Sequence, residues 1–140
     1  MKSRTTLLIL IIALVAPLRA DDIKLEKGLG NLHRPVSTKN ALAQQYFDQG
    51  MRYLYAFNHE QAVASFKKST ELDSDLAAGY WGAALALGPN INLDVDPDRE
   101  KQAYDTVQTA LAHMSHASQK EQDLVNTLAR RYSNDPKADL

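Results

Sequence analysis

The chain has 140 residues, with 16 basic and 17 acidic side chains, four histidines and no cysteine. A net charge of −1 provides no electrostatic basis for binding nucleic acid or anionic lipid. Without cysteine there are no disulfides and no thiol chemistry, so the stability of the fold must come from packing. The length suffices for one compact domain.

The first twenty residues have the pattern of a secretory signal peptide. Two basic residues precede an unbroken apolar run over residues 7–16, and the small Ala20 comes before Asp21 and Asp22. The run is about half as long as a bilayer span, so a retained anchor is the weaker interpretation. We therefore expect residues 1–20 to be removed, leaving a periplasmic or secreted protein with no integral membrane span. The remaining 13 basic and 17 acidic side chains have a net charge of −4, which again excludes nucleic acid.

Residues 21–39 are expected to form an extended arm. Gly28, Gly30 and a single proline interrupt the segment, and it shows no sustained period. Ser37 or Thr38 at its end is a candidate N-cap for the first helix.

A helical repeat domain is expected over residues 40–134, followed by a tail at 135–140. Its five predicted helices cover residues 40–57, 59–72, 76–87, 97–115 and 119–132. Four boundary signals support them: Asn58 as an N-cap, Gly88-Pro89 as a stop, Asp96-Pro97 as a start, and Ser118 with Glu121 as a capping box.

Two pairs of aromatic residues, Tyr46-Phe47 and Tyr80-Trp81, lie 34 residues apart, which is the period of the tetratricopeptide repeat (TPR). Gln49 in the leucine position and Ser74 in the proline position depart from the signature. The sequence predicts an all-α, TPR-like solenoid of about two and a half helical hairpins. Five residues at the remaining signature positions should be in mutual contact: Tyr46, Gly50, Tyr53, Ala62 and Phe66.

Three longer sequence segments support this interpretation. GLGNLHRPVST (28–38), YFDQGMRYLYAFNHEQAVASF (46–66) and YWGAALALGPNIN (80–92) resemble a family of exported bacterial TPR proteins. The resemblance covers about residues 28–134. It implies a helical repeat scaffold outside the cytoplasm, and it implies no assigned reaction. Members of the family are usually several times longer, so the chain resembles their N-terminal part, as a fragment or a truncated member.

The inner helices of such a scaffold line a groove, and the residues that follow the packing positions point into it. The five candidates for contacting a partner are Phe47, Met51, Tyr55, Trp81 and Leu85. None is a lysine or asparagine of the kind that grips a terminal carboxylate. They either bind a hydrophobic peptide or are covered by the arm and by neighbouring helices.

Two weak candidates for a metal site are present. His113 and His116 share a helical face at a spacing compatible with copper or zinc. Asp94, Asp96 and Asp98 alternate like calcium ligands, although the position that requires glycine is not glycine and a proline interrupts the loop. Helix capping explains the aspartates, and interaction with a helix dipole explains the histidines, without an ion. We therefore predict no metal and no cofactor.

No nucleophile motif, phosphate-binding loop or zinc-protease motif is present, so an enzyme is not predicted. The predicted function is binding of a protein or peptide partner by a scaffold. The alternatives are a periplasmic metal-binding protein and a self-associating structural repeat. Because the fifth helix lacks an outer partner, Leu124, Leu128 and Tyr132 should be uncovered. This predicts either a homodimer through residues 119–132 or docking of the arm onto the repeats.

Overall fold

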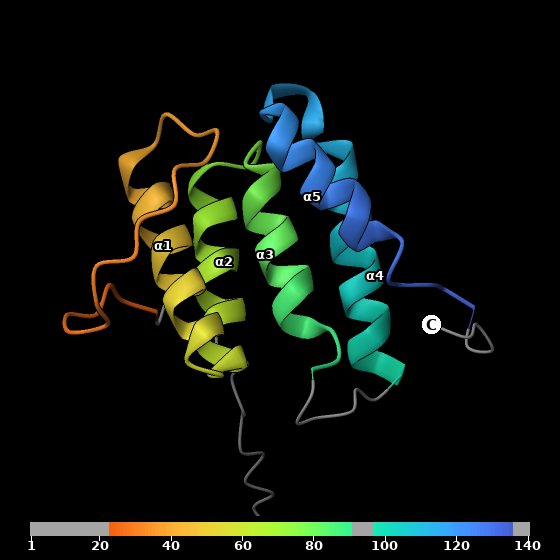
Figure 1. Cartoon of the computed structure of the whole chain (residues 1–140), viewed down its shortest axis with the longest axis horizontal. Coiled ribbons are helices and arrows are strands. Elements are labelled where there is room, and N and C mark those ends of the chain that lie inside the picture. Colours follow the sequence, from red (N-terminus) through yellow and green to blue (C-terminus); the bar gives the residue numbers. More distant parts are fainter. Residues whose placement is uncertain (1–22, 91–96, 136–140) are drawn as a thin grey trace, which may run out of the picture.

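A computed structural model of the protein describes residues 23–90 and 97–135, and within these residues every secondary-structure element is a helix and there is no β-strand (Figure 1). The five predicted helices are confirmed, each to within three residues at either end. The helices are α1 (Ala41–Tyr55), α2 (His59–Leu72), α3 (Ala77–Leu87), α4 (Pro97–Ala112) and α5 (Gln119–Ala129), with a short 3-10 turn, η2 (Met114–His116), before α5. The leader expected at 1–20, the Asp96 cap and residues 136–140 of the tail lie outside the described residues.

The predicted caps of α2 and α5 are confirmed. The Asn58 side chain accepts a hydrogen bond from the backbone N–H of Gln61 at 3.4 Å, and Ser118 and Glu121 form the capping box of α5. The predicted cap of α1 is wrong. Asn40 caps that helix, and its side chain accepts from the N–H groups of the second and third helical residues. Ser37 and Thr38 precede this cap, and their hydroxyl oxygens accept from the backbone N–H groups of Ser118 and Asn40 instead of from the first turn of α1.

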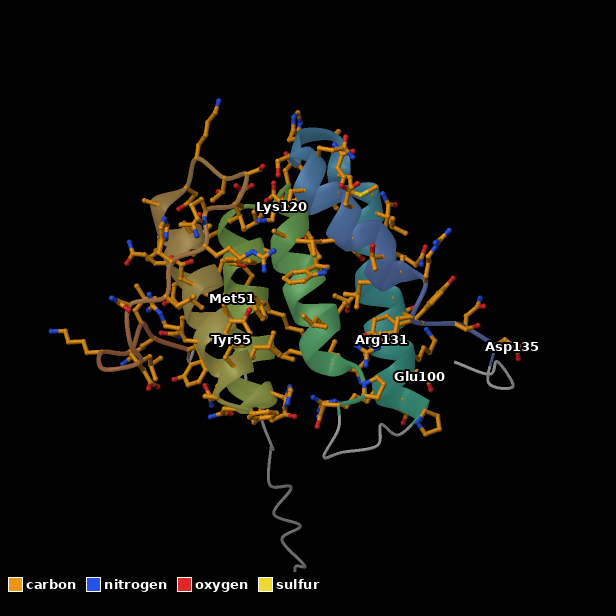
Figure 2. The ribbon with its side chains drawn as sticks, in the orientation of Figure 1. Met51, Tyr55, Glu100, Lys120, Arg131 and Asp135 are labelled. Carbon is orange, nitrogen blue, oxygen red and sulfur yellow. The ribbon has the colours of Figure 1, made fainter. Side chains whose placement is uncertain are left out.

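The helices pack as successive hairpins, each chiefly against its neighbours in sequence. In addition, α3 contacts both α1 and α5, so these three helices form one row while α2 and α4 complete the hairpins (Figure 1). Long polar side chains such as Lys120 project outward from this bundle (Figure 2). Among the described helices, none is long and apolar enough to cross a membrane.

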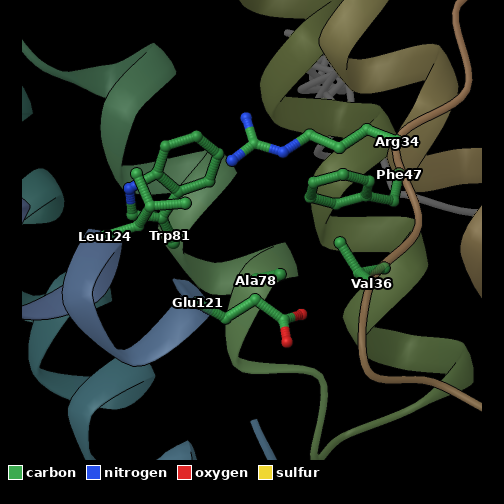
Figure 3. A pocket seen from close by; sticks show the side chains of 7 residues that line it. All are labelled: Arg34, Val36, Phe47, Ala78, Trp81, Glu121 and Leu124. Carbon is green, nitrogen blue, oxygen red and sulfur yellow. The ribbon is translucent and has the colours of Figure 1, made fainter. Parts of the chain in front are cut away.

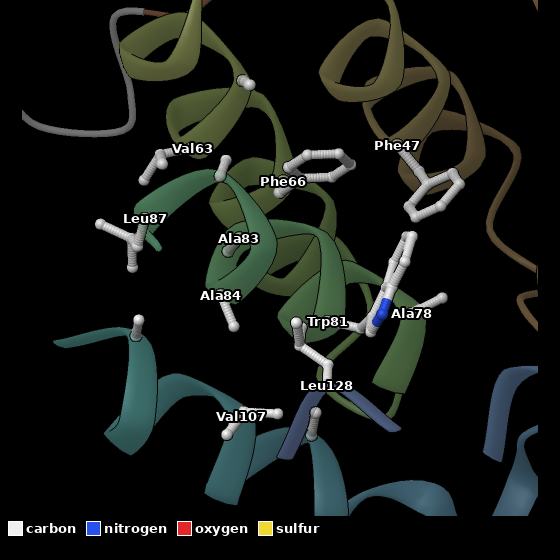
Figure 4. Close-up of a cluster of buried hydrophobic side chains, with 14 of the residues drawn as sticks. Phe47, Val63, Phe66, Ala78, Trp81, Ala83, Ala84, Leu87, Val107 and Leu128 are labelled. Atoms are coloured by element: carbon white, nitrogen blue, oxygen red, sulfur yellow. The ribbon is translucent and has the colours of Figure 1, made fainter. Parts of the chain in front are cut away.

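The centre of the core is the fully buried ring of Phe66 on α2. A Cβ atom built on Gly50 of α1 would lie 2.7 Å from this ring, and one built on Gly82 of α3 would lie 2.5 Å from it. The ring therefore fits between two helices only because both present a bare backbone. Phe47 packs against the same ring at a centroid distance of 5.5 Å (Figure 4). Gly50 and Phe66, two members of the predicted signature cluster, are thus in direct contact.

The apolar face of α5 is covered more fully than its sequence predicts. Leu128 and Tyr132 are buried, whereas Leu124 stays partly exposed. The expectation that all three would be uncovered is therefore wrong, because α5 packs against α3 as well as α4. Tyr132, which follows the end of α5, donates its hydroxyl to the carbonyl of Ala84 at 3.0 Å and fills the space beside Gly88.

Candidate functional site

The five predicted groove residues are not equivalent in the structure. Phe47, Met51 and Trp81 are buried, Leu85 is partly buried, and Tyr55 is 65% exposed. Tyr55 lies one turn beyond Met51 on α1, at the end of the helix, and the covering elements do not reach it (Figure 2). The structure therefore assembles Phe47 and Trp81 into one site, where the arm covers them, and leaves Tyr55 outside it.

The arm, residues 23–39, lies against α1 and crosses toward the start of α5 (Figure 1). It is non-helical throughout. Burial alternates near its C-terminal end: His33 and Pro35 are exposed, while Arg34 and Val36 are partly buried. This is the alternation of an extended segment with one face on the protein. Docking of the arm, one of the two outcomes expected from the sequence, is therefore present in the structure, and the homodimer stays a prediction.

Gln44 of α1 binds the arm through both ends of its side-chain amide. Its Oε1 accepts from the backbone N–H of Val36 at 3.0 Å, and its Nε2 donates to the backbone carbonyl of Arg34 at 2.9 Å. One side chain thus satisfies a carbonyl and the N–H two residues later. These are the two groups that an extended strand offers on one edge. Pro35, which has no N–H to satisfy, occupies the position between them.

Gln49, one turn further along α1, repeats this arrangement on the first part of the arm. Its Oε1 accepts from the N–H of Glu26 at 2.8 Å, and its Nε2 donates to the carbonyl of Lys24 at 3.0 Å and to Ser65 at 3.2 Å. The glutamine that departs from the leucine of the repeat signature is therefore an arm-binding residue. The Glu26 side chain lies near Tyr53, where burial first and this carboxylate second raise the pKa of Tyr53 to about 12.

Asp48 and Arg52 complete a polar stripe along α1. Asp48 is 5% exposed, and its carboxylate accepts from the N–H of Arg34 at 3.0 Å and from Gln44 at 3.0 Å, with the ring of His33 at 2.7 Å. Arg52 donates to the carbonyl of Leu32 at 2.6 and 3.1 Å. A buried carboxylate is tolerated only when its oxygens are satisfied, and here three donors meet it.

Beyond α1, the arm covers the two aromatic side chains that line the predicted groove, Phe47 and Trp81. The guanidinium of Arg34 lies over the ring of Trp81 at 5.2 Å from its centroid, within the range of a cation–π interaction (Figure 3). Beside this pair is a small cavity of about 10 Å³, which is room for one water molecule. Its lining residues come from the arm, α1, α3 and α5: Arg34, Val36, Phe47, Ala78, Trp81, Glu121 and Leu124.

Glu121 joins the arm to the first turn of α5. Its carboxylate accepts from the backbone N–H of Ser37 at 2.8 Å and from the Ser37 hydroxyl, and also from the N–H and hydroxyl of Ser118 at 2.8 and 2.5 Å. Burial raises the pKa of this carboxyl, but the hydrogen bonds from Ser118 and Ser37 outweigh burial and lower the pKa below its ordinary value. The capping box that the sequence predicts therefore has a second role, which is to hold the end of the arm.

Of the two histidines considered as metal ligands, His113 has structural partners. The ring of His113 stacks on Tyr80 at a centroid distance of 5.3 Å and lies 3.2 Å from Asp75, linking the end of α4 to the α2–α3 turn. His116 lies in η2, where it is exposed. Asp98 is an exposed first-turn residue of α4, while Asp94 and Asp96 lie outside the described residues. Over residues 23–90 and 97–135, no group of three or more histidine or carboxylate side chains is placed to hold a metal ion.

The residues that bind the arm were mostly missed by sequence reasoning, which selected apolar positions. Gln44, Asp48 and Arg52 are spaced four apart on α1 and therefore share one face. A polar stripe on a helix that is apolar on its other faces is a signal of a polar partner. The departure of Gln49 from the repeat signature was a second such signal.

Comparison with protein-family models, with curated proteins and with solved structures yields no match for this chain. The site must therefore be interpreted from its own geometry.

Proposed function

We propose that the protein is an exported TPR-like scaffold whose α1–α3–α5 face binds an extended segment of a protein partner. The observation that carries this proposal is that the same face already holds an extended segment. On this face Gln44 satisfies a carbonyl and an N–H of the arm main chain, and beside α2 Gln49 does the same for an earlier part of the arm. Main-chain recognition of this kind accepts many sequences, as when a peptide adds to the edge of a sheet.

The arrangement of the helices agrees with a TPR-like solenoid. In such a solenoid each hairpin has an inner and an outer helix, and the inner helices of successive hairpins touch. Here α3 touches both α1 and α5, and Phe66 and Gly50 meet at two signature positions. The inner helices would then be the three that face the arm.

Export follows from the leader pattern at residues 1–20. Expression in a bacterium should release a soluble chain that begins at or near Asp21. Mass spectrometry of the periplasmic fraction tests this, and an intact Met1 in the membrane fraction would contradict it.

Panning a random 12-residue peptide library against the full chain tests binding. We expect enriched peptides whose binding is lost when Leu124, which lines the groove, is replaced by Glu. The matched control is Leu42→Glu, because Leu42 is 41% exposed on α1 and lines no described cavity. The proposal would be contradicted if no peptide were enriched, or if the enriched peptides bound both the Leu124→Glu and the Leu42→Glu variants as well as the unaltered chain.

A further inference from the structure

The arm segment at residues 34–37 makes four different kinds of contact with the groove. The Arg34 guanidinium lies over Trp81, the main chain on either side of Pro35 pairs with Gln44, Val36 faces the small cavity, and Ser37 binds Glu121. Three of the contacts favour a chemical type, which is a planar cation, an aliphatic side chain and a hydroxyl. The pairing with Gln44 uses no group of the exposed Pro35 and therefore accepts proline at that position.

We infer that the partner segment is basic and extended, with the order arginine, proline, aliphatic residue, serine or threonine, and that residues 34–37 occupy its place. This inference rests on the proposed function and adds the chemistry of the ligand. The arm is then an internal copy of the ligand, which the partner displaces.

The conformation of the arm fits this role. Proline disfavours the helical region for the residue before it and has a backbone angle suited to an extended segment. A segment containing Arg-Pro is therefore partly organised before it binds, which lowers the entropic cost of binding. Gln44 needs a carbonyl from the residue before proline and an N–H from the residue after it, so proline costs no hydrogen bond at the site.

Charge favours the same class of partner. The arm at residues 23–39 has four basic side chains and one acidic side chain, a net charge of +3, whereas residues 40–135 have eight basic and 13 acidic side chains, a net charge of −5. The carboxylates of Asp48 and Glu121 lie at the groove itself. An acidic surface raises the local concentration and the association rate of a basic segment.

A second copy of the chain is the weaker occupant. Its arm would make the contacts that the arm in place already makes, with no gain in energy. Attachment to the same chain also gives the arm in place an effective concentration in the millimolar range. A segment of a different protein can add contacts beyond the arm and so displace it, and we therefore assign the site to a foreign segment.

The test uses a fluorescent peptide with the sequence of residues 31–38 and the full chain. We expect weak binding to the unaltered chain, because the arm competes. Binding should become at least about tenfold tighter in the double variant Arg34→Ala, Val36→Gly, which removes the cation–π and cavity contacts of the arm but leaves the groove intact. The single variant Arg34→Ala serves if the double variant does not unfold cooperatively. Sedimentation of the same samples shows whether a second copy binds instead.

Two further measurements test the assigned contacts. On the loosened chain, Gln44→Met should weaken peptide binding by at least about fivefold, because two hydrogen bonds are lost. The control Gln108→Met makes the same change on the exposed side of α4 and should leave binding unaltered. A peptide in which arginine is replaced by alanine should bind about three- to thirtyfold more weakly.

The outcomes separate this inference from the proposed function. If neither loosened variant binds the peptide, or if Gln44→Met has no effect, the arm is a structural cover and the inference is wrong. If the random library still yields groove-dependent peptides of other chemistry, the proposed function survives that failure. Dimers of the loosened chain that the peptide does not dissociate would overturn the assignment to a foreign segment.

Discussion

At the scale of single residues, the packing of the core depends on two glycines that have no side chain. Gly50 and Gly82 face the ring of Phe66 from opposite helices, and neither position has room for a methyl group. Glycine inside a helix costs about 1 kcal/mol relative to alanine. The packing of a complete aromatic side chain between α1 and α3 offsets that cost, since burying such a side chain contributes about 1.5 to 3 kcal/mol.

Replacing Gly82 with alanine should therefore destabilise the protein, although the same change stabilises an ordinary helix. We expect the overpacking cost of about 1 to 3 kcal/mol to exceed the gain in helix propensity. Phe66→Ala should cost about 3 to 5 kcal/mol. Urea unfolding monitored by circular dichroism measures both.

The control for this experiment is Asn126→Ala, because Asn126 is exposed on α5 and only helix propensity changes there. In the double variant Gly82→Ala, Phe66→Ala, the two costs should not add, since removing the ring makes room for the new methyl group. Additive costs would show that the ring and the glycine do not share the same space.

The roles of single residues were predictable where they depend on neighbours in the sequence. The caps at Asn58 and Ser118 follow from short-range signals, and the structure has both. The cap of α1 was not predictable in the same way. Ser37 and Thr38 are good capping residues, but the helix begins after Asn40, which is also a preferred N-cap. Three neighbouring candidates of similar preference leave the local signal unable to choose among them.

At the scale of elements, the arm and α5 are coupled through Glu121. Its lowered pKa means that the ionised carboxylate is more stable, relative to the protonated form, in the folded protein than in the unfolded chain. The resulting stabilisation is fully present above the ordinary glutamate pKa of about 4.3 and is lost as the pH falls through the lowered value.

Replacing Glu121 with glutamine should therefore lower the melting temperature at pH 7, and the difference from the unaltered chain should shrink as the pH falls below about 4. Thermal unfolding between pH 7 and pH 3 measures this. Asp98→Asn is the matched control, because Asp98 is also a first-turn carboxylate but is exposed. A destabilisation by Glu121→Gln that does not change with pH would mean that shape, not charge, holds the arm.

The element order was predictable because helical periodicity and caps are strong signals over residues 40–134. The candidate site was predictable only in part. Phe47 and Trp81 do line it, but the stripe pattern could not show what covers them. The arm has no period of its own, and its position is set by side chains of α1, chiefly Gln44, Asp48 and Gln49. Those contacts become visible only when the helix and the arm are placed together.

At the scale of the whole molecule, the arm and the end of α5 remove the reason for self-association that the sequence suggested. Leu128 and Tyr132 are buried within the chain, and the arm covers Phe47 and Trp81. Of the three residues expected to form an apolar face on α5, only Leu124 stays partly exposed. Association through residues 119–132 stays a prediction for conditions in which the arm is released.

The purified protein should therefore sediment as a monomer over a wide concentration range, whereas the double variant Arg34→Ala, Val36→Gly should associate in the absence of peptide as its concentration rises. The physical reason is that a released arm exposes two aromatic side chains beside Leu124, and exposing each costs roughly 1.5 to 3 kcal/mol. Adding Leu124→Asp to the double variant should restore the monomer if the contact runs through α5. Association of the unaltered chain would show that a surface not covered by the arm mediates self-association. A double variant that stays monomeric at every concentration would show that the arm does not prevent a second copy from binding the groove.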